Sequence, residues 1–396
     1  MRRIGVATFA RSDYSSCLPV MKAIQAEPGL ELHLIVAGAH LSAAFGRTED
    51  NILSDGFPVA DRVKMSPEAD TPEALALSVG TGMQGFARSF GRVKPDLLVL
   101  VGDRLELFAA ACAALPFRLP LAHISGGDVT EGAIDNQVRF AVTRLSHLHF
   151  VAMQAHADRL IGGGEETWRV HVTGDPALDF IRGMRFMDRP VLEAELGLTL
   201  KPPLLVISFH PTTLGVASVV EEVDALLSAL TRLEGTLVFT FPNADAGSSV
   251  IIDKLKRFVA SRPCAKLFNN LGQRKYYNLL AQADLMVGNS SSGIWESPSF
   301  HLPAVNVGER QRGRFRAPNV LDAEANPDAI SQAVRRGLDT SFRAGLSGLS
   351  NPFGDGCAAA RIVDELKKVD LGPDLLQKKM EAREPTLSDG GGGVLT

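Results

Sequence analysis

Residues 96–115, DLLVLVGDRLELFAAACAAL, decide the fold. Residues 96–102 form a near-continuous apolar run after Asp96, which is typical of a strand buried on both faces of a parallel sheet. Residues 104–115 follow with a helical pattern, and Asp103 and Arg104 lie at the junction. Ligands of open parallel sheets bind at the carboxyl ends of the strands. The stretch therefore predicts an α/β fold with a polar site at this turn.

The same alternation of strand and helix extends in both directions. We expect further strands at 3–9, 32–38, 121–125, 147–152, 204–210, 236–242, 283–289 and 303–308, and an early helix at 15–27. The pattern pauses near 196–206, where Pro202 and Pro203 stand together, and then restarts. This pause predicts two Rossmann-like, doubly wound domains facing across a cleft. We place them at 1–185 and 186–356.

Composition indicates an ordinary globular chain. The 396 residues are 45% hydrophobic and 22% charged, with a formal net charge of −4 and no long block of like charge. Bulk electrostatics therefore predict neither a nucleic-acid nor a membrane partner. The sequence shows no signal-peptide pattern and no apolar run of the roughly 18 residues that span a bilayer. We expect a cytoplasmic protein whose Gly-rich end, 385–396, is disordered.

The cysteines and histidines do not form a metal-ligand pattern. The four cysteines are far apart in the sequence, at Cys17, Cys112, Cys264 and Cys357. We interpret them as four buried thiols in a reducing compartment. The sequence predicts neither a metal site nor a cofactor.

Two segments are candidates for binding an anionic nucleotide. Arg11, Ser12 and Ser15 follow the first strand, where helix amides attract anions, although Asp13 or Ser15 could simply cap that helix. The second segment, 288–314, places Asn289 and three serines before a helix. We expect Glu296 inside that helix, where its carboxylate suits a ribose diol. Four arginines follow, at Arg310, Arg312, Arg314 and Arg316; they could neutralise a diphosphate or form a solvated loop.

The acid–base candidates also follow predicted strands. Asp103 and Arg104 end one strand, and the segment 123–139, HISGGDVTEGAIDNQVR, ends the next. In that segment Asp135 starts a helix that carries Arg139 one turn later. Each group has a structural alternative: a helix cap for Asp103, a surface pair for Asp135 and Arg139, and a packed side chain for His210. Convergence on one edge of the sheet favours acid–base chemistry.

These motifs together resemble the UDP-N-acetylglucosamine 2-epimerase family, in particular its hydrolysing branch, which feeds sialic-acid-type pathways and cell-surface polysaccharides. The resemblance covers about residues 3–370 and is carried by RSDYS, VGDR, HISGGDVTEGAID, HPTT, FPNADAG and GNSSSGIWESPSFHLPAVNVGERQRGR. It implies a GT-B-type fold with a C-terminal helix, 357–370, that crosses back to the first domain. It also implies a homodimer or homotetramer.

The resemblance assigns roles residue by residue. It implies nucleotide or substrate contacts by Arg11, Ser15, Arg104, Asn243, Leu271, Ser290, Ser291, Glu296 and Arg310. It implies catalytic roles for Asp103, Asp135, Arg139 and His210. The implied reaction removes the C2 proton and the nucleoside diphosphate to form a glycal, then adds water, which releases the C2-inverted sugar.

One departure from the family pattern falls in the acid–base segment. Ser125 stands where the family has an essential glutamate, and a serine needs activation to act as a base. Asp128, Glu131, His123 or Asp103 could take over the proton transfer, or the chemistry could be changed or lost. The alternatives are therefore a GT-B glycosyltransferase or a nucleotide-sugar-binding homologue without turnover. A non-hydrolysing epimerase typically has HVEAGLR at this turn, which this sequence lacks.

Overall fold

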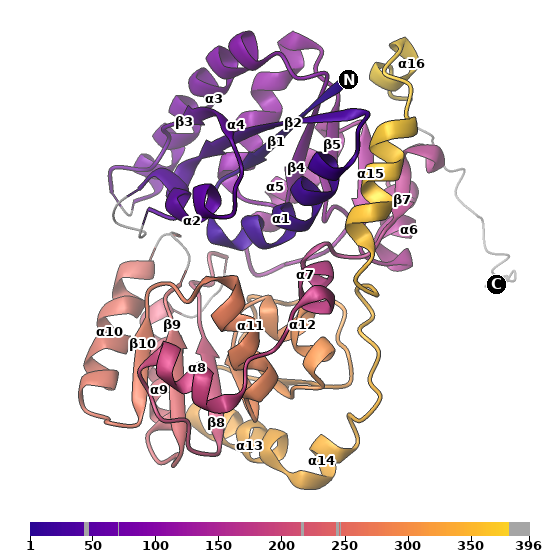
Figure 1. The fold of residues 1–396 in the computed structure, drawn as a ribbon. Coiled ribbons are helices and arrows are strands. Elements are labelled where there is room, and N and C mark those ends of the chain that lie inside the picture. The colour runs from indigo at the N-terminus through magenta and orange to yellow at the C-terminus, as the bar shows by residue number, and fades with distance from the viewer. Residues whose placement is uncertain (43–46, 70, 215–217, 243–244, 246, 380–396) are drawn as a thin grey trace, which may run out of the picture.

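The computed structural model describes residues 1–42, 47–69, 71–214, 218–242, 245 and 247–379. Over these residues the chain forms two parallel sheets with helices packed on both faces, one sheet in each half of the molecule (Figure 1). The predicted α/β class and the two Rossmann-like halves are thereby confirmed. None of the described helices is long and apolar enough to cross a bilayer.

The strands of the two sheets follow one another along the chain. The N-terminal sheet contains β1 (Arg2–Thr8), β2 (Leu30–Ala37), β3 (Val59–Val63), β4 (Leu97–Val101), β5 (Leu121–Ile124), β6 (Leu148–Val151) and β7 (Val170–Val172). The C-terminal sheet contains β8 (Leu204–Ser208), β9 (Thr236–Thr240), β10 (Ala265–Phe268), β11 (Leu285–Gly288), β12 (Ala304–Val307) and β13 (Val320–Ala323). Each predicted strand is present, with ends that differ by one or two residues.

Strand order places the functional turns. The sheets have the orders β3-β2-β1-β4-β5-β6-β7 and β10-β9-β8-β11-β12-β13. In each, the order reverses between two neighbouring central strands: β1 and β4 in the first sheet, β8 and β11 in the second. Such a reversal opens a crevice at the carboxyl ends of the strands. The turns after these four strands therefore form the two facing edges of the cleft.

The helices of the N-terminal half are α1 (Arg11–Ala26), α2 (Glu49–Ser54), α3 (Pro72–Val93), α4 (Leu105–Ala114), α5 (Asp135–Leu145), α6 (Gln154–Gly162) and α7 (Ala177–Gly183). The remaining helices are α8 (Arg189–Leu196), α9 (Val219–Leu230), α10 (Ser248–Ala260), α11 (Gly272–Gln282), α12 (Ser292–Trp295), α13 (Pro327–Leu338), α14 (Thr340–Ala344), α15 (Ala358–Lys368) and α16 (Pro373–Leu376). Short 3-10 turns lie at Gly38–Leu41, Leu115–Phe117, Thr167–Arg169 and Ser297–Phe300.

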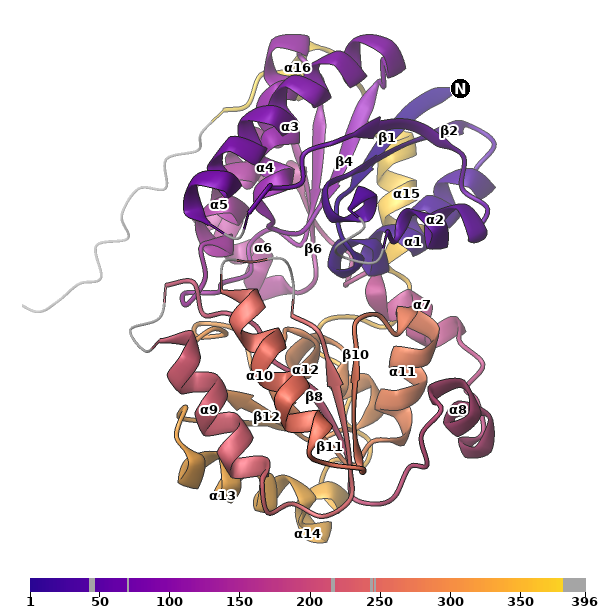
Figure 2. The ribbon, with the colours of Figure 1, turned by 90° about the vertical axis from the view of Figure 1, so that its left-hand side faces the viewer.

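The helices of the N-terminal half cover opposite faces of its sheet (Figure 2). Apolar side chains of α1 and α15 pack with Ile4, Val6 and Val99 in one core. Side chains of α3, α4 and α5 pack with Leu98 and Leu100 in another. Because neighbouring residues of a strand point to opposite faces, these two cores identify the two sides of the sheet.

The C-terminal end of the chain returns to the N-terminal half. Helix α15 follows the last helices of the C-terminal half and packs against α1 (Figure 1). Arg169, which is fully buried, then donates hydrogen bonds to the carbonyl oxygens of Asp374 and Leu375. The predicted domain limits, 1–185, 186–356 and 357–370, stay predictions. The whole of the predicted tail, 385–396, lies outside the described residues, as does 380–384.

Three expectations about local structure need correction. Strands β3, β7, β10 and β13 were not predicted from the sequence; each lies at or next to a sheet edge, where apolar runs are short. Of the four free cysteines, which the sequence predicts to be buried, Cys17 is buried and the other three are partly exposed. Glu296 follows helix α12 rather than lying inside it, since the chain turns into a 3-10 segment at Ser297.

Candidate active site

Two adjoining cavities lie between the halves of the molecule. The larger has a volume of about 420 Å³ and the smaller about 130 Å³. Both are lined by residues of the two sheets' strand-exit turns. The residues common to both cavities are Ser12, Ser15, Ser291, Glu296 and Arg310. A ligand with two parts could therefore place one part in each cavity and its linking group at this common wall.

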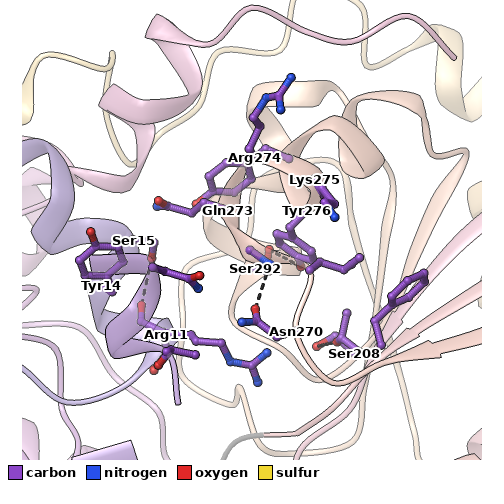
Figure 3. Close-up of a pocket in the computed structure, with 18 of the residues that line it drawn as sticks. Arg11, Tyr14, Ser15, Ser208, Asn270, Gln273, Arg274, Lys275, Tyr276 and Ser292 are labelled. Atoms are coloured by element: carbon purple, nitrogen blue, oxygen red, sulfur yellow. Dashed lines mark hydrogen bonds between the residues drawn. The ribbon is translucent and has the colours of Figure 1, made fainter. Parts of the chain in front are cut away.

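The larger cavity lies between α1 and α11. Arg11 and Ser15 of α1 face Gln273 and Tyr276 of α11 across it (Figure 3). The Arg11 side chain also donates a hydrogen bond to the backbone oxygen of Asn269, which connects the two halves. Burial lowers the pKa of the Arg11 guanidinium. This cavity also contains the predicted residues Leu271, Ser290 and His210 in its wall.

The polar residues at the start of α1 were interpreted either as an anion site or as a helix cap, and the structure separates the two. Asp13 is buried and accepts hydrogen bonds from the backbone N–H groups of Phe9 and Ala10, at 2.9 and 2.7 Å. Thr8 donates a third bond to it, at 2.6 Å. Asp13 therefore stabilises the turn into the helix, and Ser12 and Ser15 remain on the wall of both cavities.

Glu296 lies on the common wall in a buried position. Its Oε2 has no hydrogen-bond partner among the described residues. Burial and the nearby Asp175 carboxylate raise the pKa of Glu296 to about 7. Next to it, the Tyr276 hydroxyl donates to Ser292 at 2.8 Å. A buried acceptor without a partner costs free energy, so this carboxylate is suited to accept a ligand hydroxyl.

His210 lies in the wall of the larger cavity rather than beside the acids of the N-terminal half. Its backbone N–H donates to the Asn289 side chain at 2.7 Å, and its Nε2 lies 3.4 Å from the Ser208 hydroxyl. Burial and the charges of Arg310, Arg11 and Arg104 lower the pKa of His210 well below its usual value. The lowered pKa favours the neutral form of the His210 imidazole, and the catalytic role predicted for it stays a prediction.

The smaller cavity contains an unequal pair of carboxylates, Asp103 and Asp135. Burial would raise the pKa of Asp103, but the charges of Arg139 and Arg314 outweigh it and hold that pKa below its usual value. Burial, together with the charges of Asp103 and Asp245, raises the pKa of Asp135 to about 7. Two carboxyl groups whose pKa values are pushed apart are typical of acid–base sites.

Arginines hold this pair in place. Arg139 is fully buried and donates to the Asp103 carboxylate and, at 3.0 Å, to the Thr130 hydroxyl. The structural alternative, a surface pair between Arg139 and Asp135, is therefore not formed. Arg310 instead lies 3.7 Å from Asp135, and Arg104 pairs with Glu106 at 3.2 Å and with Asp245 at 3.6 Å. Arg310 thus faces both the carboxylate pair and the larger cavity.

Asp128 and Glu131 bind arginines from the other half. Asp128 is buried and lies 2.6 Å from Arg314, whereas Glu131 is half exposed and lies 2.8 Å from Arg312. Asp128 lines the smaller cavity, but Glu131 does not. Both pairs join the segment after β5 to the segment after β12. These two ion pairs therefore connect the two halves of the molecule.

The remaining predicted residues have clear positions. His123 is fully buried in β5, 2.7 Å from the Gly102 carbonyl oxygen, and burial lowers its pKa to about 4. It lies behind the smaller cavity rather than in its wall. Ser125 does line that cavity, with a backbone φ of 70° that is unusual for a residue other than glycine. Asn243 lies outside the described residues.

The structure adds Asp175 to the smaller cavity and places Arg314, one of the four arginines named from the sequence, in its wall. Asp175 follows β7, a strand of three residues that the sequence pattern does not reveal. The polar turn GDP at 174–176 was the available signal, because polar residues after a strand mark the ligand edge of a parallel sheet. Over the described residues, no group of three or more His, Cys, Asp or Glu side chains is arranged to hold a metal ion.

The fold and these cavities define a two-domain α/β enzyme in which a cavity lined by serines and arginines lies beside a carboxylate pocket. Comparison with known proteins gives the family. The sequence model of the UDP-N-acetylglucosamine 2-epimerase family matches residues 22–367. The chain belongs to this family, as its motifs predict.

Its relatives indicate the type of enzyme. The chain is 36% identical to the GDP/UDP-N,N′-diacetylbacillosamine 2-epimerase (hydrolyzing) of Campylobacter jejuni, over 86% of this chain and 89% of that protein. It is 32% identical to the UDP-N,N′-diacetylbacillosamine 2-epimerase (hydrolyzing) of Legionella pneumophila, over 96% and 99%. The chain is a hydrolysing nucleotide-sugar 2-epimerase, and the transferase and non-catalytic alternatives are not favoured.

A solved structure supports the GT-B-type fold. The UDP-GlcNAc 2-epimerase from Neisseria meningitidis, bound to UDP-GlcNAc, matches with a TM-score of 0.79 over 93% of this chain and 100% of that one. Its sequence identity is 16%, so the likeness concerns the fold alone. The predicted roles of individual residues stay predictions.

Proposed function

We propose that the substrate is a nucleotide-linked 2,4-diacetamido sugar of the UDP-N,N′-diacetylbacillosamine type. The enzyme would release the C2-inverted free sugar and the nucleoside diphosphate. The observation that carries the chemistry is the unequal pair Asp103 and Asp135 beside the anion cavity. The choice of sugar is supported by the names of the two relatives at 36% and 32% identity. UDP-GlcNAc is the second candidate, favoured by a Neisseria meningitidis relative at 30% identity.

The larger cavity would bind the nucleotide. Ser290 and Ser291 offer hydroxyls after β11, and Arg11 and Arg310 offer positive charge from the two halves. Such groups neutralise a diphosphate and stabilise it as a leaving group. The unpartnered Glu296 carboxylate would accept hydrogen bonds from the ribose hydroxyls. The sugar would then extend past the common wall into the smaller cavity.

Asp135 would act as the general base. A base is most effective when its pKa lies near the working pH, and the pKa of Asp135 is raised to about 7. It would remove the C2 proton while the C1–O bond breaks, so that the C2–H electron pair forms the C1=C2 double bond of a glycal. Asp103, which stays ionised beside Arg139, would raise the proton affinity of Asp135. Water would then add across the double bond.

Proton NMR in D2O tests this function. The enzyme is incubated separately with UDP-diacetylbacillosamine, its GDP-linked analogue and UDP-GlcNAc. A free C2-inverted sugar that carries deuterium at C2, with one nucleoside diphosphate per sugar, is expected fastest for a diacetylbacillosamine substrate. Faster turnover of UDP-GlcNAc would move the assignment to that sugar. Absence of turnover with all three would overturn the proposed function.

We also propose a cytoplasmic homodimer or homotetramer that supplies a sugar for sialic-acid-type surface polysaccharides. The support is a relative at 30% identity named as a polysialic acid biosynthesis protein of Escherichia coli. Light scattering of the purified protein gives the oligomeric state directly. A monomer at working concentration would contradict that part of the proposal.

A further inference from the structure

The reaction proposed above requires two proton transfers at C2, on opposite faces of the sugar. The base removes a proton from one face, and an acid returns one to the other. At residue 125, where the family motif has a glutamate, this chain has Ser125 on the wall of the smaller cavity. A serine hydroxyl is a poor proton donor at neutral pH without activation. Another group must therefore donate the proton to C2 on the second face of the sugar.

The carboxylates that line the smaller cavity are Asp13, Asp103, Asp128, Asp135, Asp175 and Glu296. Three of them are committed elsewhere. Asp13 accepts three hydrogen bonds at the start of α1, and Asp128 is paired with Arg314 at 2.6 Å. Glu296 comes from the opposite half and also faces the larger cavity. Asp175 is therefore the remaining candidate beside the pair Asp103 and Asp135.

The structure fixes Asp175 firmly but leaves one of its oxygens open. Its backbone N–H donates to the Phe353 carbonyl oxygen at 2.8 Å. Its Oδ1 accepts from the Ala177 N–H at 2.8 Å and from the Ser16 hydroxyl at 3.2 Å. Oδ2 has no hydrogen-bond partner among the described residues. Burial raises the pKa of Asp175 to about 6, so a protonated fraction is present near neutral pH.

Asp175 and Asp135 lie next to helices that pack on opposite faces of the N-terminal sheet. Asp135 is the first residue of α5, which packs on the side of α3 and α4. Asp175 lies two residues before the start of α7, which packs with α1 on the other side of the sheet. Figure 2 shows the helices α1 and α5 on either side of the strands. A sugar held at the edge of the sheet would have one carboxyl group on each side.

We propose that Asp175 donates the proton to C2 in the hydration step, in place of the glutamate that Ser125 replaces. This inference rests on the proposed function. In the first step Asp135 takes the C2 proton, and the nucleoside diphosphate leaves with the C1–O electron pair. In the second step a water oxygen bonds to C1 and gives up a proton to solvent. The electron pair of the double bond takes the Asp175 proton at C2. Solvent then reprotonates Asp175 and deprotonates Asp135.

The test compares the parent enzyme with Asp175→Asn and the matched control Asp179→Asn. Asn keeps an oxygen for the Ala177 N–H but cannot donate a carboxylic proton. Asp179 lies one helical turn further on, accepts the Ala358 and Ala359 N–H groups, and does not line the cavity. With the nucleotide sugar turned over by the parent, we expect Asp175→Asn to lower free-sugar formation about 100-fold. Glycal and nucleoside diphosphate should be released instead, whereas the control should form free sugar within threefold of the parent.

Two further measurements separate a catalytic role from a structural one. Calorimetry with UDP should give the same affinity for Asp175→Asn as for the parent. The double variant Asp175→Asn with Ser125→Glu should recover free-sugar formation at least tenfold over Asp175→Asn alone, because it restores a carboxyl group to the cavity.

Free-sugar formation by Asp175→Asn within threefold of the parent would overturn the inference. So would a fall in turnover that is matched by a fall in UDP affinity, or a loss without either glycal release or rescue. Failure of the parent enzyme with each nucleotide sugar would instead overturn the proposed function itself.

Discussion

The two halves of the cleft differ in the chemistry that they present. The N-terminal half contributes carboxylates, of which Asp103, Asp135 and Asp175 line the smaller cavity. The C-terminal half contributes the serine hydroxyls after β11, the Arg310 guanidinium and one buried carboxylate, Glu296. The first set suits proton transfer, and the second suits an anion and a diol. The two sheets share the order of their first six strands, and the N-terminal sheet adds β7. This shared order supports two different tasks, because the tasks depend on the turns.

The largest expected effect is on the proton-transfer half. Asp135→Asn removes the proposed base but keeps the size of the side chain. We expect kcat to fall about 1,000-fold, since general bases typically contribute 10²–10⁴-fold. UDP affinity should change less than threefold, because Asp135 does not line the larger cavity. Turnover and calorimetry on the same preparations check both values; a parallel loss of UDP affinity would contradict the division of tasks.

A smaller but broader effect is expected on the nucleotide half. Arg310→Met should lower kcat/KM about 100-fold, as removal of one charge-stabilising group typically does. It should also weaken UDP binding, which Asp135→Asn should not. The matched control is Arg312→Met, because Arg312 is exposed and pairs with Glu131 outside both cavities. Equal losses in the two arginine variants would remove Arg310 from the proposed diphosphate site.

The fold was predictable because its signals are local. Each central strand is an apolar run, and the polar residues of the site follow those runs directly, as Asp103 and Ser290 do. Strand β7 has only three residues, so the pattern did not reveal it, and Asp175 was missed with it.

Pairing across the cleft was not predictable from the sequence. Asp128 and Glu131 were candidate carboxylates, yet their partners Arg314 and Arg312 stand more than 180 residues later. Sequence spacing cannot show which of many arginines will lie beside a given acid. The raised pKa of Asp135 depends in the same way on Asp103, Asp245 and burial. Only the folded arrangement separates a base from a structural ion pair.

A pH profile sharpens the comparison within the carboxylate half. Asp135 must be ionised to accept a proton in the first step, so the rate of nucleoside diphosphate release by the parent in a single turnover should rise with pH through about 7 and then level off. The charge of Asp103 opposes that ionisation, while Arg310 and Arg104 favour it. Asp103→Asn removes the negative neighbour, so the rising limb should move at least about one pH unit lower. If the rate of Asp103→Asn rises at the same pH as that of the parent, ionisation of Asp135 does not control this pH dependence.

The smallest effect is expected for Glu131→Gln, although the sequence alone made Glu131 a catalytic candidate. Its carboxylate is half exposed, pairs with Arg312 and lies outside the cavity that contains Asp103 and Asp135. Exposed ion pairs typically contribute about 0–1 kcal/mol. We therefore expect the free energy of unfolding to fall by less than about 1 kcal/mol. We also expect kcat to stay within about twofold of the parent, whereas loss of a true general base would lower kcat at least about 100-fold. Urea unfolding and turnover measure the two quantities. A 100-fold loss of kcat without loss of stability would return Glu131 to the catalytic group, and the cleft would then need a different closed arrangement from the one described here.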